Sequence, residues 1–283
     1  MVVYCRQALF LLLFLCSNSW AELITAKTMD EVSQHFKRSA AEIDAQYIFG
    51  VFDVDLVLFT PGFAALQAPN VQNYSDILHN MLANLNNQQQ DILANLLASE
   101  TLPVLIDQQD PKIIKKIEEQ GVKLIALTTL LTGAVDNIPN YEVWRYLSLK
   151  DLDIDFSKSF PGFKELRFTD VPRYCGRYPV FYQGVLNANG AGRVIDSKGD
   201  ILIKFLQKVK FTPKKVILVS NRREDLVAVE KSIKVFDNNI KFLAIYYTAA
   251  ESYPLIPIEE AVFVKTWEKF IERAKHLSKK ITK

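Results

Sequence analysis

The feature that most constrains the fold is a continuously apolar run at residues 47–52, which ends on two acids, Asp53 and Asp55. The run is rich in β-branched and aromatic residues, and it lacks the polar alternation of a strand with one wet face. It therefore predicts a strand that is covered on both sides. Strands of this kind are typical of parallel sheets with helices packed on either face.

Four further short runs share this apolar character, and helical patterns separate them. The runs lie at residues 122–127, 216–219, 242–247 and 261–264. Apolar residues three and four positions apart, as in amphipathic helices, recur at residues 28–44, 111–120, 198–210 and 222–236. Strands that alternate with helices in this way predict an α/β fold with a doubly wound, Rossmann-like parallel sheet.

Two stretches fall outside this alternation and are interpreted as insertions. Residues 60–108 are mostly helical in pattern and rich in Asn and Gln, whereas residues 130–197 contain Gly, Pro, Asn and aromatic residues. Both follow strands, so we expect them to cover the carboxyl edge of the sheet, where doubly wound proteins bind ligands. The chain from residue 22 to 283 is then one domain with two helical or irregular cap insertions.

The basic carboxyl-terminal segment, residues 265–283, carries one apolar stripe at helical spacing. The stripe consists of Trp267, Phe270, Ile271, Ala274 and Leu277. We expect a last helix that packs this stripe on the sheet and exposes its lysines to water. A membrane-binding amphipathic helix is the alternative.

The first 21 residues predict a signal peptide. Arg6 precedes an apolar run at residues 8–16, and Ser19 and Ala21 fit the small-residue rule for cleavage after Ala21. The run is short for a bilayer span, so we expect no stable membrane span after cleavage and a periplasmic or secreted protein. An uncleaved anchor is the alternative.

Charge and cysteine content exclude several partners and chemistries. Lys and Arg number 34 against 32 for Asp and Glu, so the charge balance favours neither nucleic acid nor an anionic membrane. Without the leader only Cys175 remains, which excludes an intramolecular disulfide and, with no histidine nearby in sequence, favours an inert, half-buried thiol over a nucleophile. His35, His79 and His276 lie at no zinc-ligand spacing.

The acid pair is the strongest candidate for a functional site. Asp53 and Asp55 close the apolar strand, and the two carboxylates should leave it on the same side and converge near one point, because side chains alternate along a strand. Two acids beside apolar backbone need a bound cation, a lysine or a shared proton to offset their repulsion and lost hydration. A pair that caps a turn at the strand end is the alternative, but acids at the carboxyl edge of such a sheet favour function.

Four motifs in order resemble the haloacid dehalogenase (HAD)-like superfamily. Residues 52–57, with Asp53 and Asp55, resemble its first motif; Thr128 matches the second and Lys198 the third. The fourth falls at residues 216–221, with Asp225 downstream, so the resemblance spans about residues 45–247. Residues 152–161 and 198–200 further resemble an uncharacterised bacterial branch that often carries a signal peptide.

The resemblance implies phosphoryl transfer through an aspartyl-phosphate. Asp53 would be the nucleophile, and Asp55 would protonate the leaving oxygen and then deprotonate the attacking water. Thr128 and Lys198 would hold the phosphoryl oxygens. The substrate would be a small phosphorylated molecule, whose identity depends on side chains of the insertions.

The resemblance also implies a Mg²⁺ ion, and here the sequence departs from the family. Asp53, the backbone carbonyl of Asp55 and a fourth-motif acid would normally bind it. Ser220 and Asn221 stand where the family usually has two acids, which leaves Asn221 and Asp225 as the remaining fourth-motif ligands. A neutral ligand binds a divalent cation more weakly.

Two functions therefore compete. The first is an exported, Mg²⁺-dependent HAD-like phosphatase, a phosphoric monoester hydrolase. The second is a catalytically weakened HAD scaffold that acts as a secreted binding or interaction module, and the altered fourth motif is its support. Arg173, Tyr174, Arg177 and Tyr182 either contact a ligand or pack the second insertion.

Overall fold

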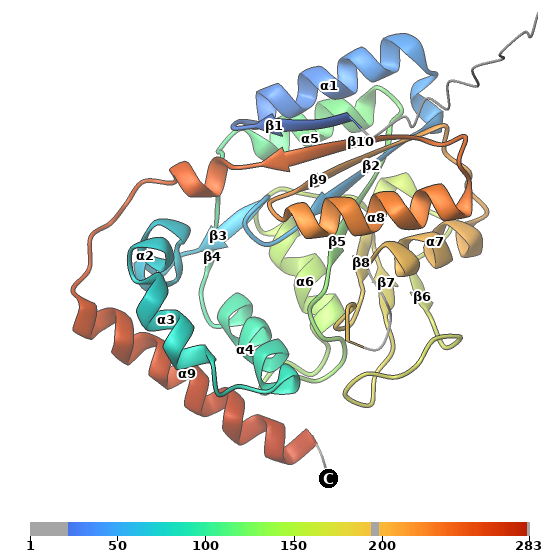
Figure 1. Cartoon of the computed structure of the whole chain (residues 1–283). Helices are drawn as coiled ribbons and strands as arrows, with labels where there is room; N and C mark the ends of the chain where they lie inside the picture. The colour runs from blue at the N-terminus through green and yellow to red at the C-terminus, as the bar shows by residue number, and fades with distance from the viewer. Residues whose placement is uncertain (1–21, 194–197, 282–283) are drawn as a thin grey trace, which may run out of the picture.

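An eight-stranded mixed sheet forms the centre of the protein in the computed structural model, which describes residues 22–193 and 198–281 (Figure 1). The predicted signal peptide, residues 1–21, lies outside the described residues. Helices cover both faces of the sheet. The predicted α/β class with a Rossmann-like, mostly parallel sheet is confirmed.

Six neighbouring strands pair in parallel, and two further strands extend one edge through antiparallel pairing. In spatial order the strands are β1 (Glu22–Ala26), β10 (Lys241–Tyr247), β9 (Lys215–Ser220), β2 (Ile48–Asp53), β5 (Lys123–Thr128), β8 (Val185–Asn187), β7 (Val180–Tyr182) and β6 (Glu165–Arg167). β7 pairs antiparallel with β8 and β6 pairs antiparallel with β7, so within this sheet β7 runs opposite to the other strands. The runs predicted at residues 47–52, 122–127, 216–219 and 242–247 form the four adjoining strands β2, β5, β9 and β10.

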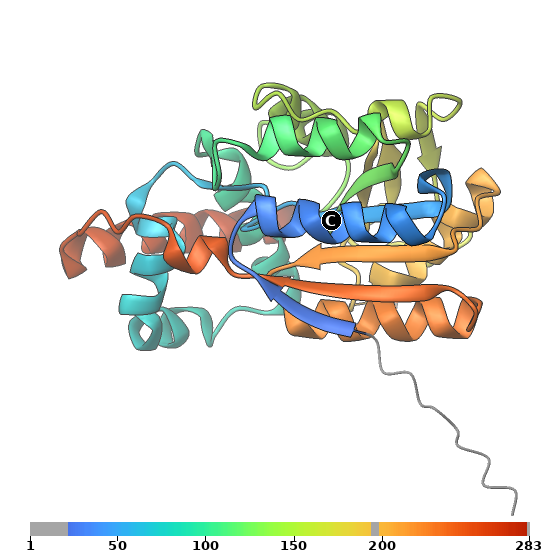
Figure 2. The same ribbon diagram turned by 90° about the horizontal axis from the view of Figure 1, so that it is seen from above.

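Each face of the sheet has its own hydrophobic core. α1 (Met29–Glu42) and α5 (Asp110–Glu119) cover one face, and α7 (Lys198–Val209) and α8 (Arg223–Phe236) cover the other (Figure 2). β2 is buried along its whole length. Its Phe52 stacks between Phe36 and Phe156 in the first core, whereas its Phe49 stacks on Phe205 in the second. The uninterrupted apolar run is therefore explained by burial on both sides.

The first insertion is a helical unit on a two-stranded stem. β3 (Phe59–Pro61) pairs with β4 (Pro103–Leu105), and between them lie α2 (Ala68–Asn73), α3 (Ser75–Leu82) and α4 (Asn87–Ser99). The last helix, α9 (Glu260–Ile281), packs beside α3 and α4 (Figure 1). Together they bury a third core that includes Leu93, Leu96, Phe263 and Trp267.

Two expectations about the carboxyl terminus were wrong. The strand predicted at residues 261–264 is the start of α9, and the apolar stripe of this helix packs on the first insertion instead of the sheet. Phe263 and Trp267 are buried one turn apart, whereas Val262, the residue before Phe263, is half exposed. A run of four apolar residues cannot by itself separate a strand from one face of a helix.

The second insertion adds strands that the sequence did not predict. It contains α6 (Tyr141–Lys150), followed by β6, β7 and β8, which extend the sheet beyond β5. Short 3₁₀ helices lie at η1 (Ala45–Tyr47), η2 (Ala64–Leu66), η3 (Ser157–Ser159) and η4 (Ala249–Ser252). β1 was also missed, and it pairs with β10 at the other edge. Strands of three residues carry too little periodicity to stand out from loops.

At the carboxyl edge of the sheet, the order in which the chain connects the strands reverses at β2. From β2 the chain moves to β5 on one side, and it later returns to β9 on the other. Ligands of doubly wound sheets bind at such switch points. In the part of the chain that the structure describes, no helix combines the length and apolar character needed to cross a membrane.

Candidate active site

Three adjacent parallel strands end on polar residues at this switch point. Asp53 ends β2, Thr128 ends β5 and Ser220 ends β9. All three residues are buried, and Asp53 is the most exposed of them at 7%. Because parallel strands place their carboxyl ends at one edge, the register brings together side chains that are far apart in sequence.

Lys198 joins two acids at this edge. Its Nζ lies 2.8 Å from Oδ2 of Asp53 and 2.7 Å from Oδ2 of Asp225, and the Ser220 hydroxyl donates to the same Asp53 oxygen at 3.0 Å. We call Asp53, Lys198, Ser220 and Asp225 the acid–lysine cluster. Burial lowers the pKa of Lys198, but the charges of Asp53 and Asp225 outweigh burial and the net shift is upward. Lys198 is therefore a charged, buried neutralising group.

The residue after the lysine explains how the cluster is assembled. A side-chain carbon at Gly199 would lie 2.6 Å from the Ser232 hydroxyl and 2.9 Å from the Cα of Val229, both on α8. Only glycine lets the start of α7, which carries Lys198, pack this closely on α8, which carries Asp225 in its first turn. The close packing of the two helices places the ammonium between the two carboxylates.

Asp55 lies beyond the end of β2 and has a different cation. Its Oδ1 lies 3.3 Å from Nη2 of Arg145, and its Oδ2 accepts a 3.5 Å hydrogen bond from the Thr128 hydroxyl. The expectation that both acids close the strand was wrong: β2 ends at Asp53, because Leu56 adopts a left-handed conformation, with φ of 62°, and its N–H bonds to the carbonyl of Phe59. Each acid of the pair is thus neutralised separately, Asp53 by a lysine and Asp55 by an arginine.

Arg145 is the site residue that sequence reasoning missed. It lies on α6 in the second insertion, and its side chain has no exposed surface. The available sequence signal was weak: Asn140 caps a short helix with an arginine beside Trp144, inside a segment expected to be irregular. The sequence pattern does not predict a contact between Arg145 and Asp55, because that contact depends on how the second insertion packs against the end of β2.

The structure brings together most of the predicted metal ligands but not a set of acids sufficient for a closed metal site. Asp53 and Asp225 meet at Lys198, and the half-buried Asn221 directly follows Ser220 at the end of β9. Among the described residues, no three His, Cys, Asp or Glu side chains are grouped so as to hold a metal. Mg²⁺ commonly uses one or two carboxylates together with substrate phosphate and water, so the residues present fit such an open site.

The four polar residues of the second insertion for which the sequence allows either ligand contact or packing all have protein partners. Tyr174 donates to Asp91, Arg177 donates to the carbonyl of Ala134, the Arg173 guanidinium lies over Tyr178, and Tyr182 packs edge-on to Tyr146. These contacts favour the packing role.

Cys175 is half-buried, and burial is the first cause of the upward shift of its thiol pKa. A raised pKa leaves little thiolate at neutral pH, which agrees with an inert thiol.

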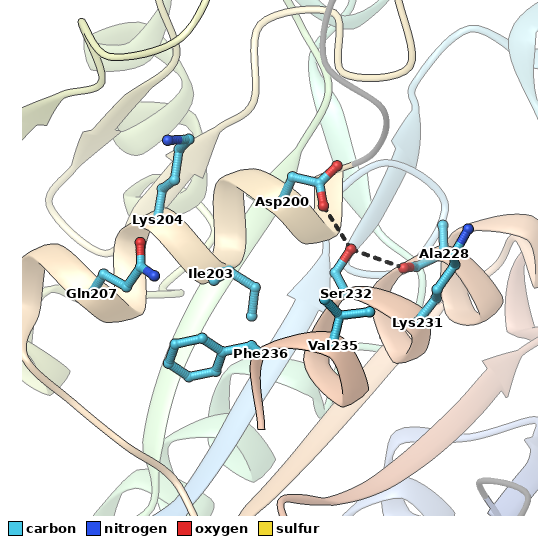
Figure 3. Close-up of a pocket in the computed structure, with 9 residues that line it drawn as sticks. All are labelled: Asp200, Ile203, Lys204, Gln207, Ala228, Lys231, Ser232, Val235 and Phe236. Atoms are coloured by element: carbon cyan, nitrogen blue, oxygen red, sulfur yellow. Dashed lines mark hydrogen bonds between the residues drawn. The ribbon is translucent and has the colours of Figure 1, made fainter. Parts of the chain in front are cut away.

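A surface hollow lies apart from this site. Figure 3 shows it between α7 and α8, with Ile203, Val235 and Phe236 among its lining residues. Asp200 and Ser232 are joined there by a 2.9 Å hydrogen bond (Figure 3). No residue of the acid–lysine cluster lines this hollow.

Fold and site together define a class: an α/β protein with a Rossmann-like sheet, two insertions after its central strands, and a buried acid–lysine cluster at the switch point. The chain belongs to the family described as protein of unknown function (DUF2608), whose model matches residues 25–282.

Relatives of similar length occur in Rickettsia. An uncharacterized protein of Rickettsia felis is 30% identical over 251 residues, which cover 86% of this chain and 82% of the relative. Uncharacterized proteins of Rickettsia typhi and Rickettsia conorii are 30% and 28% identical over 250 and 248 residues, again covering 86% of this chain and 82% of each relative.

Proposed function

We propose that this protein is a Mg²⁺-dependent phosphatase of the HAD-like type, acting on a small phosphorylated molecule through an aspartyl-phosphate. The observation that carries the proposal is the state of Asp53. Its Oδ2 is held by Lys198 and Ser220, whereas its Oδ1 accepts a 3.0 Å hydrogen bond from the Val54 backbone N–H. Lys198 thus anchors Oδ2 by its charge, and Oδ1 would be the oxygen that attacks phosphorus.

The proposed reaction has two steps. In the first, Oδ1 of Asp53 bonds to phosphorus, the ester P–O bond breaks, and Asp55, in its protonated form, gives its proton to the leaving oxygen. In the second, Asp55 takes a proton from water as the water attacks phosphorus, and the bond to Asp53 breaks. The sum is ester plus water giving alcohol plus phosphate. The 40% exposure of the Asp55 side chain supports its role in exchanging protons with substrate and water.

The surrounding residues support phosphoryl binding. A lysine ammonium has three N–H donors, and the ion pairs with Asp53 and Asp225 use two of them. The proposal assigns the third to a phosphoryl oxygen. Thr128, which now donates weakly to Asp55 at 3.5 Å, would supply a second donor.

Asp53, the Asp55 carbonyl, Asn221 and Asp225 would hold the Mg²⁺ ion, which when bound offsets the negative charge of the phosphate. Because Asn221 is neutral and Lys198 already engages both carboxylates, we expect weak binding. Export to the periplasm or medium is part of the same proposal, and it rests on the predicted signal peptide alone.

The first prediction concerns the nucleophile. Purified protein should hydrolyse an aryl phosphate slowly and only with Mg²⁺ or Mn²⁺, and Asp53→Asn should lower kcat by about 10⁴-fold or more, because the amide cannot form the covalent intermediate. Release of the aryl alcohol, followed by absorbance with and without a chelator, measures this. Asp76→Asn, on the exposed side of α3, is the matched control and should keep full activity. Equal rates for wild type and Asp53→Asn would contradict the proposal.

A second candidate function is a secreted binding module, and one observation favours it. The Ser220 hydroxyl donates to Asp53, and Lys198 pairs with both buried acids, which supports a purely structural role for the cluster. If the protein is a binding module, phosphorylated ligands should bind without being hydrolysed.

The second prediction separates the two functions at Asn221. If Asn221 is a metal ligand, Asn221→Asp adds a charge, and it should tighten Mg²⁺ binding about tenfold and raise the metal-saturated rate. Isothermal titration calorimetry with MgCl₂ measures the affinity. Asn239→Asp, at an exposed turn after α8, adds the same charge away from the site. Unchanged affinity in Asn221→Asp would remove Asn221 from the metal site.

A further inference from the structure

Arg145 combines full burial with an incomplete set of partners. Its Nη2 reaches Oδ1 of Asp55 at 3.3 Å, while Nε and Nη1 are buried without a hydrogen-bond partner. The contact is longer than a typical charge-assisted hydrogen bond of about 2.7–2.9 Å. A buried charge held by so few contacts is costly, so its presence beside the acid pair calls for an explanation.

An arginine cannot escape this cost by losing its proton. A buried carboxyl group such as Asp110 can become neutral, and the pKa of Asp110 is raised to about 8 by burial and by the charge of Asp107. Arginine keeps its charge throughout the pH range of a folded protein. The position of Arg145 therefore depends on the groups that surround the guanidinium.

Two aromatic rings cover the guanidinium and link it to both insertions. Its Cζ lies 5.1 Å from the ring centre of Phe59, in the stem of the first insertion, and 5.0 Å from that of Trp144, next to it on α6. Cation–π contacts of this kind offset part of the lost hydration. One turn earlier on α6, the Tyr141 hydroxyl donates to the carbonyl of Asn95 on α4 at 2.7 Å.

The exposure of the two charged side chains decides how Arg145 can act. Arg145 has no exposed surface, whereas the Asp55 side chain is 40% exposed. A dissolved substrate therefore meets Asp55 and not the guanidinium. Any effect of Arg145 on chemistry has to pass through the acid that it holds.

We propose that Arg145 is a positioning residue that fixes the orientation of the Asp55 carboxylate, an inference that rests on the proposed phosphatase function. Arg145 holds Oδ1 and Thr128 contacts Oδ2, so the carboxylate is restrained at both oxygens. The second insertion thereby supplies a group that positions the acid proposed for proton transfer. A small misplacement of an acid or base is enough to lower a rate about 100-fold.

A double-mutant cycle tests this role. We expect Arg145→Met to lower kcat for an aryl phosphate about 10- to 100-fold with little change in KM, because substrate contacts are untouched. In an Asp55→Asn background the same change should lower kcat less than about twofold, because the group on which Arg145 acts is gone. Arg145→Lys keeps the charge but not the planar fork and stack, and it should recover only part of the rate.

Lys150→Met is the matched control, since it removes a cation from the exposed end of the same helix and should leave kcat unchanged. Thermal unfolding of every variant establishes that the proteins compared are folded. If Arg145→Met does not fold, the comparison is made with Arg145→Lys. Equal losses in the wild-type and Asp55→Asn backgrounds, or a loss expressed in KM, would overturn positioning. Failure of the phosphatase proposal shows separately, as activity that does not depend on Asp53.

Discussion

Asp110 begins α5 with a carboxyl group that has no exposed surface and no hydrogen-bond partner at either oxygen. Burial, and next the charge of Asp107, raise its pKa from 3.8 to about 8. The Tyr247 hydroxyl is likewise buried without a partner, and burial followed by the charge of Asp110 raises the pKa of Tyr247. The folded protein therefore keeps Asp110 protonated at neutral pH.

The third prediction follows from the sign of this shift. Below about pH 4 Asp110 is protonated in both states, but between about pH 4 and 8 only the unfolded state ionises, so stability falls as pH rises through this window. In Asp110→Asn the free energy of unfolding should depend less on pH in this window. The loss between about pH 4 and pH 8 should be smaller than in the wild type by on the order of a few kcal/mol. Urea unfolding at a series of pH values measures it. Asp30→Asn, exposed at the start of α1, should leave the slope unchanged.

At the residue scale, sequence and structure contribute unequally to the site. Asp53, Asp55, Thr128 and Lys198 are identifiable because strand ends and a motif order can be followed along the chain. Arg145 is not, because its contact spans 90 residues and depends on the fold of an insertion. Side chains on regular elements are predictable in position, whereas those on insertions depend on tertiary packing.

At the scale of elements, α9 shows how a helix far along the chain completes an insertion. Phe263 on α9 is fully buried and packs against the tilted ring of Tyr74, with 4.7 Å between ring centres. The Tyr74 hydroxyl donates to the carbonyl of Ile258, just before the helix. α2 to α4 alone would leave their apolar side chains uncovered, so we expect the first insertion to depend on α9.

The fourth prediction tests this dependence. Phe263→Ala should destabilise the protein by about 3–5 kcal/mol, the usual cost of removing a buried phenylalanine. Hydrogen exchange should show faster opening in α3 and α4 than in β2, because the third core loses the contacts. Val262→Ala, on the exposed side of the same helix, should change stability by less than about 0.5 kcal/mol. Uniform loss of protection across sheet and insertion would show that the two unfold together.

Element prediction succeeded where burial produced an unambiguous pattern. The four central strands are short, apolar and bounded by helical periods, so local pattern and tertiary position agree. Residues 261–264 have the same composition but face another helix, and β6 to β8 have only three residues each. In both cases neighbouring elements, absent from the local pattern, decide the conformation.

At the scale of the whole molecule, three hydrophobic cores and several hydrogen bonds and ion pairs connect the insertions to the sheet and to the site. The Asp91 carboxylate on α4 accepts from Tyr174 at 2.5 Å and from Arg193 at 3.1 Å, which connects the first insertion to the second. Arg145 makes a second connection, from α6 to Phe59 and Asp55. Both insertions are therefore tied to the residues that flank the acid–lysine cluster.

The sequence by itself determined the α/β class, the central strands and the place of the acid pair. Strands buried on both faces need continuous apolar runs, and the helices between them need a periodic apolar stripe, so both are visible as local patterns. Tertiary structure decided which cation neutralises each acid, where the last helix packs and how far the sheet extends. Those outcomes depend on contacts between residues far apart in the chain, and no local pattern specifies which distant partners will meet.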